Sequence, residues 1–336
     1  MRPAIKAIAT HLPERVVTNE ELGTDNPAWH MDLVSKKTGV LSRHVARDDE
    51  TALDLAIAAC RTLFDKEPSA QDAIDAILFC TQEGDYVMPP NSCLLHAELG
   101  LDDHVVAFDY NLACSGFTYG LTLAQGLLLA GTAKDVLLVT SHTYSKLIHP
   151  QDRSAMVLFG DGAAVTWLSA AEGEEGLIDV DIGTSGRGWR DFWVPAGGAR
   201  LPRSEETSRQ LHVDDGDFRT PENIHMNGMG VLAFVNSKVP PSVNRVLERQ
   251  GLSHDDIDLF VFHQASAIAL DTLERRLKIA NDKNFRNLER IGNLVSASIP
   301  VALHDAIESG RVEAGDLVLL SGFGVGLSWA TALLRM

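Results

Sequence analysis

The 336-residue sequence predicts a duplicated α/β fold, in which strands and helices alternate within two halves of similar pattern. Helix and strand signals alternate along most of the chain, as expected of parallel strands joined by crossover helices. Two stretches also resemble each other in the order and spacing of their segments. A chain of this length is too long for one small core. We therefore expect two related halves, residues 1–172 and 173–336.

The elements of the first half follow from periodicity and chain breakers. The N-terminus reads as a first strand, and apolar residues recur at helical spacing over 51–64, which predicts an amphipathic helix. The remaining predicted elements are strands over 73–81, 136–141 and 163–168, a helix over 91–99 behind two prolines, and a long apolar helix over 115–130.

The second half repeats this order. The strand 75–82 is matched by 258–264, and the Cys114 segment with its helix is matched by 291–300 with a helix. The strand 135–141 is matched by 316–322. A duplicated unit explains the repeat most simply. Between the halves, residues 183–221 show little periodicity and are rich in Gly, Trp and Arg. Their aromatic content favours an ordered wall over a linker.

Composition excludes several classes of function. The net charge of −17 argues against nucleic acid and anionic membranes as partners. No run approaches the roughly 20 apolar residues of a membrane span, and the N-terminus does not resemble a signal peptide, so we expect a cytoplasmic protein. The four cysteines have no C-x-x-C spacing. Neither a disulfide framework nor a metal site is therefore expected.

Cys114 is the candidate nucleophile. It stands where the strand-like segment 105–113 meets the helix 115–130, and the first N–H groups of a helix are unpaired. Such a position favours the reactive thiolate, and the Ser115-Gly116 that follows leaves room for a substrate carbonyl. The alternative is a buried structural cysteine, because free Cys packs as a small hydrophobe.

The repeat predicts that three side chains meet. If a pseudo-twofold axis relates the halves, His263 at a strand end, Asn293 at the position matching Cys114, and Cys114 itself converge at the centre. Alone, His263 would be a core histidine and Asn293 a helix cap. Together, an amide and a neutral imidazole can donate to one thioester oxygen and stabilise an enolate. This suits decarboxylative Claisen condensation, in which the enolate attacks an acyl group on Cys114.

A glycine-rich turn over 321–330 follows a strand near the C-terminus. The backbone N–H of Val325 in this turn and that of Cys114 are candidates for an oxyanion hole. An ordinary tight turn is the alternative interpretation.

Five segments together resemble β-ketoacyl-acyl-carrier-protein synthase III, one of the thiolase-like condensing enzymes. They are Ala-Cys-Ser-Gly-Phe (113–117), Phe-Gly-Asp-Gly-Ala-Ala (159–164), Phe-His-Gln-Ala (262–265), Gly-Asn-Leu-Val-Ser-Ala-Ser-Ile-Pro (292–300) and Gly-Phe-Gly-Val-Gly-Leu-Ser-Trp (322–329). The resemblance covers essentially the whole chain. Elongating synthases carry two His and no Asn in these roles, and thiolases carry a second Cys in the C-terminal turn, which this sequence lacks.

The resemblance implies a thiolase-like five-layered α-β-α-β-α duplicated fold and a homodimer. It implies that an acyl-coenzyme A acylates Cys114 and that His263 and Asn293 form the decarboxylation pair. The second substrate would be a malonyl thioester, carried by coenzyme A or by acyl carrier protein. Coenzyme A then enters as a substrate thioester, and no bound cofactor is expected.

The resemblance also marks residues that would contact substrate. Leu33 falls where the family has a tryptophan that stacks on the adenine of coenzyme A, Lys37 falls at a neighbouring arginine, and Arg153 matches the other residue beside the adenine. Met226 and Gly228, in the Met-Asn-Gly segment, are further substrate-binding candidates.

Other positions depart from the family pattern. Ile268 and Ala233 stand where the family has an arginine and a lysine that dock the carrier protein, and Val325 replaces the middle glycine of the C-terminal turn. Met88 matches the residue that closes the partner's acyl tunnel across the dimer. In the irregular stretch, Trp189 and Trp193 are expected to line the mouth of this tunnel.

These departures keep two alternatives open. The first keeps the acylated Cys114 but transfers the acyl group to an amine, an alcohol or an aromatic β-keto product in secondary metabolism. The second is a non-catalytic partner subunit of an active synthase. Such subunits usually lose one of the three central residues, and this sequence keeps all three.

Overall fold

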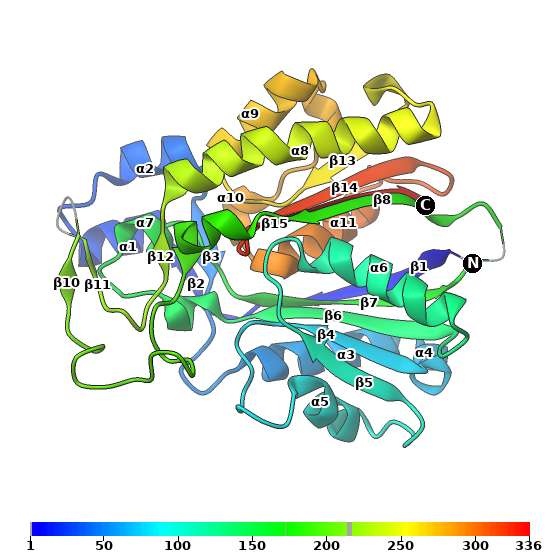
Figure 1. The fold of residues 1–336 in the computed structure, drawn as a ribbon, viewed down its shortest axis with the longest axis horizontal. Coiled ribbons are helices and arrows are strands. Elements are labelled where there is room, and N and C mark those ends of the chain that lie inside the picture. The colour runs from blue at the N-terminus through cyan, green and yellow to red at the C-terminus, as the bar shows by residue number, and fades with distance from the viewer. Residues whose placement is uncertain (1, 172, 214–216) are drawn as a thin grey trace.

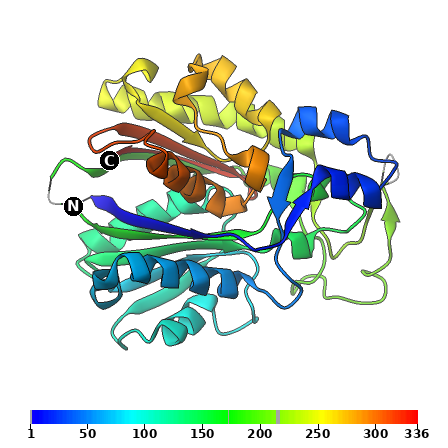
Figure 2. The same cartoon turned by 180° about the vertical axis from the view of Figure 1, so that it is seen from behind.

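The computed structural model describes residues 2–171, 173–213 and 217–336, whose helices and strands stack in five layers (Figure 1). Helices α3 and α5 cover one face of the first sheet, α6 and α11 lie between the two sheets, and α8 and α9 cover the far side of the second sheet. Seen from behind, α11 again lies between the sheets (Figure 2). Residue 172, the predicted boundary between the halves, lies outside the described residues.

The first half holds a five-stranded sheet. In spatial order its strands are β1 (Pro3–His11), β7 (Gly162–Ala170), β6 (Asp135–His142), β4 (Ala76–Cys80) and β5 (Val106–Tyr110). Its helices are α1 (Asn19–Asp25), α2 (Met31–Thr38), α3 (Ala52–Lys66), α4 (Pro68–Ala73), α5 (Asn91–Leu99), α6 (Gly116–Leu129) and α7 (Arg153–Met156), with the 3-10 helix η1 (Tyr144–Leu147) and the small hairpin of β2 (Val16–Thr18) and β3 (Ser42–His44).

The second half holds a four-stranded sheet. In spatial order its strands are β13 (Leu259–Phe262), β14 (Leu317–Gly324), β15 (Ser328–Arg335) and β8 (Gly176–Thr184). Its helices are α8 (Gly228–Gln250), α9 (Ala267–Leu277), α10 (Leu288–Ile291) and α11 (Ser298–Glu308), with the 3-10 helices η4 (His254–Asp256), η5 (Asn281–Lys283) and η6 (Val295–Ala297).

The two sheets have the same topology. β4 pairs in parallel with β6, and β13 pairs in parallel with β14. β7 in the first sheet and β15 in the second are each antiparallel to both of their neighbours. An isolated parallel bridge between Phe260 and Asn284 stands where β5 stands in the first sheet. The repeated aspartates have the same role, because Asp75 Oδ2 accepts from the Lys134 N–H at 2.7 Å and Asp258 Oδ2 accepts from the Leu317 N–H at 2.8 Å. The predicted duplication is therefore confirmed.

The expectation of parallel strands joined by crossover helices holds for only part of each sheet. β7 runs antiparallel to both β6 and β1, and β15 runs antiparallel to β14 and β8. A parallel connection needs a crossover, usually a helix. Between β6 and β7 the chain has only the short helices η1 and α7, and between β14 and β15 it has only a tight turn.

The predicted helices and strands lie close to the observed ones. The helix predicted over 51–64 is α3, which begins after Thr51, where the Thr51 hydroxyl and the Asp54 carboxylate form a capping box. The helix predicted over 91–99 is α5, and the helix predicted over 115–130 is α6. The predicted strands correspond to β4, β6 and β7, each shifted by one to three residues at its ends.

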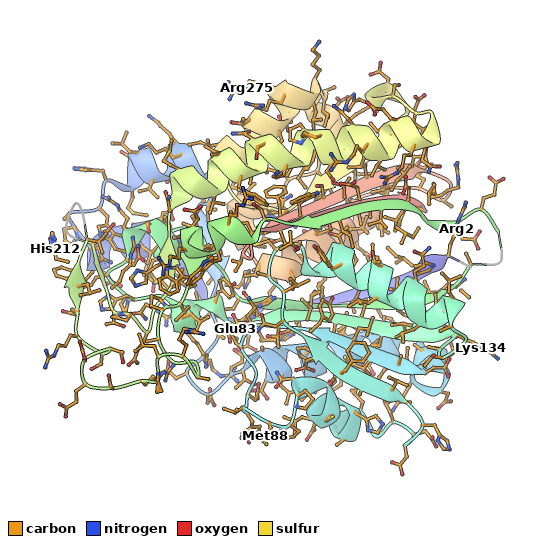
Figure 3. All side chains as sticks on the ribbon, viewed as in Figure 1. Arg2, Glu83, Met88, Lys134, His212 and Arg275 are labelled. Carbon is orange, nitrogen blue, oxygen red and sulfur yellow. The ribbon has the colours of Figure 1, made fainter. Side chains whose placement is uncertain are left out.

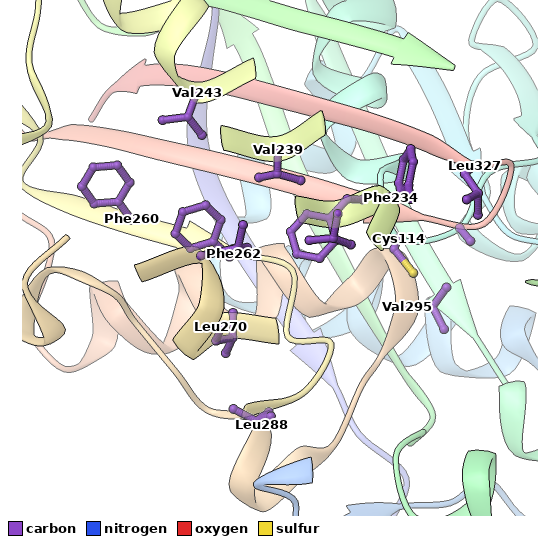
Figure 4. Packing of buried hydrophobic residues seen from close by; sticks show 14 of the residues in the cluster. Cys114, Phe234, Val239, Val243, Phe260, Phe262, Leu270, Leu288, Val295 and Leu327 are labelled. Carbon is purple, nitrogen blue, oxygen red and sulfur yellow. The ribbon is translucent and has the colours of Figure 1, made fainter. Parts of the chain in front are cut away.

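The central helices bury apolar side chains on both sides. Phe117 and Leu121 of α6 and Ile299 and Leu303 of α11 belong to one cluster with residues of both sheets. A second cluster joins α8 and α9 to the outer face of the second sheet, and Figure 4 shows Cys114 near its edge, in the same view as Phe262 and Val295. The starts of α6 and α11 lie close together, because a Cβ on Gly116 would be 3.1 Å from Ser296 Cβ.

The irregular stretch 183–221 is ordered in its described part. It contains the end of β8, the 3-10 helix η2 (Gly186–Asp191) and the short strands β9 (Phe192–Trp193), β10 (Leu211–His212) and β11 (Phe218–Arg219). β9 pairs with β12 (His225–Met226), which leads directly into α8. No helix among the described residues is both long enough and apolar enough to cross a membrane.

Candidate active site

Cys114, His263 and Asn293 line one cavity of about 260 Å³. Cys114 lies two residues before the first residue of α6, and His263 directly follows β13. Asn293 lies two residues before the first residue of η6, which leads into α11. All three side chains are at least 95% buried. Segments from both halves therefore bring a thiol, an imidazole and a carboxamide to the same enclosed space.

Two glycines of β14 pack directly against Cys114. A Cβ on Gly324 would lie 2.7 Å from Cys114 Sγ, and a Cβ on Gly322 would lie 2.6 Å from the Cys114 carbonyl oxygen. Real Cβ atoms do not approach other atoms this closely, so a side chain at either position would displace the cysteine. Glycine is therefore required at these two positions because there is no room for a side chain beside Cys114. This requirement is additional to the conformational freedom that an ordinary tight turn needs.

Burial raises the pKa of the Cys114 thiol to about 12, although hydrogen bonds from the backbone N–H groups of Val325 and of Cys114 itself oppose the rise. Burial thus opposes the effect that the helix N-terminus was predicted to have on the thiol, because the sulfur is almost completely removed from water. The nucleophilic role of Cys114 stays a prediction. The N–H groups of Val325 and Cys114 point at the sulfur. The carbonyl oxygen of a thioester attacked by this sulfur would need hydrogen-bond donors at the same place.

His263 is neutral at pH 7. Burial lowers its pKa to about 3, and the carbonyl of Val295, which faces the ring, only partly opposes this shift. The ring of Phe323 packs edge-on against the imidazole with centroids 5.6 Å apart. A neutral imidazole has one N–H donor, which is the form required to hold an enolate oxygen.

Asn293 is anchored by its backbone and by its side-chain oxygen. Its N–H donates to the Leu158 carbonyl at 2.8 Å, and its own carbonyl accepts from the Gly160 N–H at 3.0 Å. Its Oδ1 accepts from the Val295 N–H at 2.9 Å, which leaves the NH₂ group as a donor. Gly160 belongs to the Phe-Gly-Asp-Gly motif and Leu158 directly precedes it, so this segment fixes the position of Asn293.

Asn293 does not occupy the position that matches Cys114, and it does not cap α11. Cys114 lies two residues before the first residue of α6, whereas the residue two before the first residue of α11 is Ser296. The insertion of the 3-10 helix η6 between Asn293 and α11 explains the difference. The sequence repeat is too short in this region to reveal that insertion.

The predicted substrate-binding residues fall in different places. Met226 and Gly228 line the cavity that contains Cys114. Leu33, Lys37 and Arg153 together line a separate cavity of about 370 Å³. Arg153 forms an ion pair with Asp217, in which Nη2 lies 3.9 Å from Oδ2.

Met88 and the two tryptophans lie elsewhere. Met88 is 79% exposed and lies at the surface, near the segment that leads into α5 (Figure 3). Trp189 and Trp193 pack edge-to-face and line a third cavity of about 360 Å³, which also has Val325 and Phe192 in its wall. Phe192 lines the Cys114 cavity as well, so the tryptophans are separated from Cys114 by this ring.

One wall of the Cys114 cavity was not predicted. Val231, Leu232 and Val235 project into it from the first turns of α8. Their spacing of three and four residues is the usual apolar stripe of a helix, which sequence analysis assigns to core packing. The sequence signal that could have indicated this wall is the position of the stripe directly after the Met226-Asn-Gly segment, which was itself a substrate-binding candidate. The described residues contain no group of three or more His, Cys, Asp or Glu that could hold a metal ion.

Comparison with known proteins agrees with these observations. Residues 108–186 match the family model of 3-oxoacyl-acyl-carrier-protein synthase III, and residues 247–336 match the model of its C-terminal part. The chain is 36% identical over 340 residues to a β-ketoacyl-acyl-carrier-protein synthase III of Symbiobacterium thermophilum, which covers 100% of the chain and 98% of that relative.

The chain belongs to the β-ketoacyl-acyl-carrier-protein synthase III family. A second relative in this family, from Caldanaerobacter subterraneus, is 33% identical over 335 residues and covers 98% of the chain and 97% of its own length. A crystal structure of a 3-oxoacyl-acyl-carrier-protein synthase III superposes with a TM-score of 0.97 at 42% identity over the full length of both chains. The synthase III family has the thiolase-like fold, and the chain is a condensing enzyme of the synthase III type.

Proposed function

We propose that this enzyme is an acyltransferase that takes an acyl group from acyl-coenzyme A onto Cys114 and condenses it with a malonyl thioester. The observation that carries the proposal is the convergence of Cys114, His263 and Asn293 in one buried cavity. A covalent intermediate divides the reaction into two half-reactions, an acylation and a decarboxylative condensation.

In the first half-reaction, Cys114 Sγ attacks the carbonyl carbon of the acyl thioester, and the coenzyme A thiol leaves with the proton of the cysteine. The backbone N–H groups of Val325 and Cys114 point at this position and would hold the developing oxyanion. One such donor typically contributes a factor of about 10² to 10³ in rate. Because burial disfavours the free thiolate, we infer that deprotonation accompanies substrate binding.

In the second half-reaction, the malonyl thioester loses CO₂, and the electron pair of the broken bond moves to the thioester oxygen as an enolate. The N–H of neutral His263 and the NH₂ group of Asn293 donate to this oxygen. The enolate carbon then attacks the acyl carbonyl, a carbon–carbon bond forms, and the Cys114 sulfur leaves. Neither His263 nor Asn293 needs to carry a charge, which agrees with the low pKa of His263.

The cavity of Leu33, Lys37 and Arg153 is the proposed site for the nucleotide end of coenzyme A. Lys37 and Arg153 supply cations for its phosphates, and Val157 and Leu33 supply apolar surface. Met226 and Gly228 line the inner cavity, where the reactive end of the thioester would lie. We place the reaction in the cytoplasm, where both thioesters are available.

We also propose that the enzyme is a homodimer. Tyr86, Val87 and Met88 are three consecutive apolar or aromatic residues with exposed fractions of 64% or more. β5 is an open edge of the first sheet on the same side of the molecule (Figure 1). Exposed apolar segments and open sheet edges are typical of surfaces that a partner covers.

A second candidate function keeps the acylation of Cys114 but delivers the acyl group to an acceptor that is not held by a carrier protein. The observation in its favour is the rim of the Cys114 cavity, where Met229 is 77% and Ile268 is 41% exposed. An acidic carrier protein requires cations at this rim. Equal or better use of malonyl-coenzyme A than of malonyl carrier protein would favour this candidate.

Replacement of Cys114 by alanine tests the main proposal. We expect Cys114→Ala to abolish acylation, seen by intact mass, and condensation, while the decarboxylation of a malonyl thioester by His263 and Asn293 persists. His263→Ala is the complementary variant, which should still be acylated but lose decarboxylation by about 10² to 10³. Full condensing activity in Cys114→Ala would refute the assignment.

A further inference from the structure

A second polar cluster lies behind the proposed catalytic residues. His142, the last residue of β6, makes a hydrogen bond from Nδ1 to Glu83 Oε2 at 2.8 Å, and its Nε2 lies 2.6 Å from Ser296 Oγ. His142 and Ser296 are completely buried, and the Glu83 side chain is 10% exposed. Figure 3 shows Glu83 near the middle of the view, and in the chain it follows the end of β4 by three residues. We call Glu83, His142 and Ser296 the buried relay.

The relay occupies the pseudosymmetric counterpart of the active site. By position in the repeat, Ser296 corresponds to Cys114, because each stands two residues before its central helix. Cys80 corresponds to His263, because each lies five residues after the repeated aspartate of its strand. In the active site, Gly324 packs against Cys114, which stands before α6. In the counterpart centre, Ser296, which stands before α11, makes a hydrogen bond with His142. The second centre is filled by side chains and has become part of the interior.

The residue next to the relay is strained. Val295 has a φ of 57°, in the left-handed region, where a β-branched residue is a true outlier. Such strain persists only where neighbouring contacts determine the conformation. Val295 contacts both members of the decarboxylation pair, because its N–H donates to Asn293 Oδ1 and its carbonyl faces the His263 ring.

The turn around Val295 is held by hydrogen bonds within it and by contacts with the first half of the fold. Within the turn, the Leu294 N–H donates to Ser298 Oγ, and the Val295 N–H donates to Asn293 Oδ1. The backbone of Asn293, before Val295, bonds with Leu158 and Gly160 of the first half, and after Val295 the side-chain contact with the first half is Ser296 Oγ with His142 Nε2. His142 is in turn held by Glu83, whose Oε2 also accepts from the Gln82 N–H at 3.1 Å.

We propose that Glu83, His142 and Ser296 are positioning residues that hold the strained Val295 turn, and through it the donors of His263 and Asn293, in the geometry required for decarboxylation. The inference rests on the proposed roles of His263 and Asn293. It assigns no direct contact with substrate to the relay. Its effect is confined to the second half-reaction, because the acylation of Cys114 depends on the N–H groups of Val325 and Cys114.

The charge state of His142 supports this role. Burial alone would lower its pKa, but Glu83 and the Cys80 thiol raise it to about 9. The other titratable group against the imidazole is Tyr144, whose ring packs edge-on with centroids 5.5 Å apart. At neutral pH His142 is therefore an imidazolium that donates from both nitrogens, to the Glu83 carboxylate and to Ser296 Oγ.

Ser296→Ala is the direct test, because it removes one oxygen atom and leaves the backbone intact. The two half-reactions are measured separately, as the rate of Cys114 acylation by intact mass and as the rate of CO₂ release from malonyl-coenzyme A. We expect acylation within about twofold of the unmodified enzyme and decarboxylation reduced roughly tenfold to hundredfold, as for a small displacement of a catalytic group. Glu83→Gln keeps the shape of the relay and should show the same selective loss to a smaller degree.

Ser242→Ala is the matched control. Ser242 is also completely buried, and its hydroxyl donates to Asp181 at 2.6 Å, but it lies on α8 away from both centres. It should lower thermal stability without separating the two half-reactions. Equal loss of both rates, or no loss of decarboxylation, in Ser296→Ala and in Glu83→Gln would overturn the relay. Failure of the unmodified enzyme to acylate Cys114 would instead count against the proposed function itself.

Discussion

Two missing Cβ atoms, at Gly322 and Gly324, shape the site around Cys114. Gly324 leaves the space that the sulfur occupies, and Gly322 lets β14 touch the start of α6. The same contact brings the Val325 N–H to the sulfur, so Val325 can serve as a donor although it is not a glycine. Reactivity at this residue is thus a property of backbone approach, while the buried surroundings alone disfavour the thiolate.

Gly324→Ala tests this steric requirement. The added methyl group would lie within 3 Å of Cys114 Sγ and Cβ, so we expect acylation to fall by at least about 100-fold, measured by intact mass. Gly126→Ala in α6 is the control, since a Cβ there has no heavy atom within 4 Å. The control should be fully active and slightly stabilised, by up to about 1 kcal/mol. Normal acylation of Gly324→Ala would contradict the packing described here.

At the scale of elements, the segments that carry Cys114, His263 and Asn293 lie where a strand ends or a helix begins, and these elements are held by packing on two sides. α6 and α11 are buried between the sheets, and β13 and β14 place His263 and Gly324 on adjacent strands. The outer helix α8 closes the cavity with its first turns and is attached to the second sheet by charge. Asp181 of β8 accepts from Arg245 at 2.7 and 2.9 Å and from Ser242 at 2.6 Å.

Asp181→Asn tests how α8 is attached. Burial would raise the Asp181 pKa, but the hydrogen bonds from Arg245 and Ser242 lower it to about 2. Because this folded pKa lies below the ordinary value of about 3.9, the stabilisation is present above about pH 4 and is lost as the pH falls toward 2. We expect the variant to be less stable at pH 7 by roughly 1 kcal/mol, since the pair is partly exposed.

Urea unfolding at several pH values measures this difference. The gap between the unmodified protein and Asp181→Asn should narrow from pH 4 to pH 2. Asp49→Asn is the control, because Asp49 pairs with Arg47 at the surface with 83% of its side chain exposed. A gap that stays constant down to pH 2 would show that the charge of Asp181 does not stabilise α8.

At the scale of the whole molecule, the duplication produces two pseudosymmetric centres with different contents. One is a cavity lined by Cys114, His263 and Asn293, and the other is the buried relay of Glu83, His142 and Ser296, which is filled by side chains. The first half also exposes an apolar segment and a sheet edge, while the chain as a whole carries a charge of −17. The exposed apolar segment is unusual for so strongly charged a chain, and it fits the proposed dimer, in which a partner would cover it.

Val87→Asp tests the proposed dimer. Val87 is fully exposed in the single chain, so the folded protomer should tolerate the charge. We expect the dimer dissociation constant to rise at least about tenfold, measured by sedimentation equilibrium. Leu33→Asp, a substitution at a residue of α2 that is 57% exposed, should leave the dimer intact. An unmodified protein that sediments as a monomer would contradict the proposal.

Much of the fold was predictable because its signals are local. Helical spacing identified α3, a pair of prolines marked the start of α5, and apolar runs identified β4, β6 and β7. The antiparallel direction of β7 and β15 was not predictable from these runs, because a buried strand has the same composition in either direction. The cavity wall on α8 was missed for a similar reason, since an apolar stripe does not show what it faces.

Neighbouring residues carry the motifs and the periodicity, so the family, the duplicated order of elements and the candidate residues Cys114, His263 and Asn293 could be read from the sequence. The folded chain was needed for three further properties: the pKa shifts that burial imposes on Cys114 and His263, the match of Ser296 to Cys114, and the contacts of the buried relay. Those properties depend on desolvation and on contacts such as that between His142 and Ser296, which are 154 residues apart. No local pattern contains that information, because it arises when the two halves close on each other.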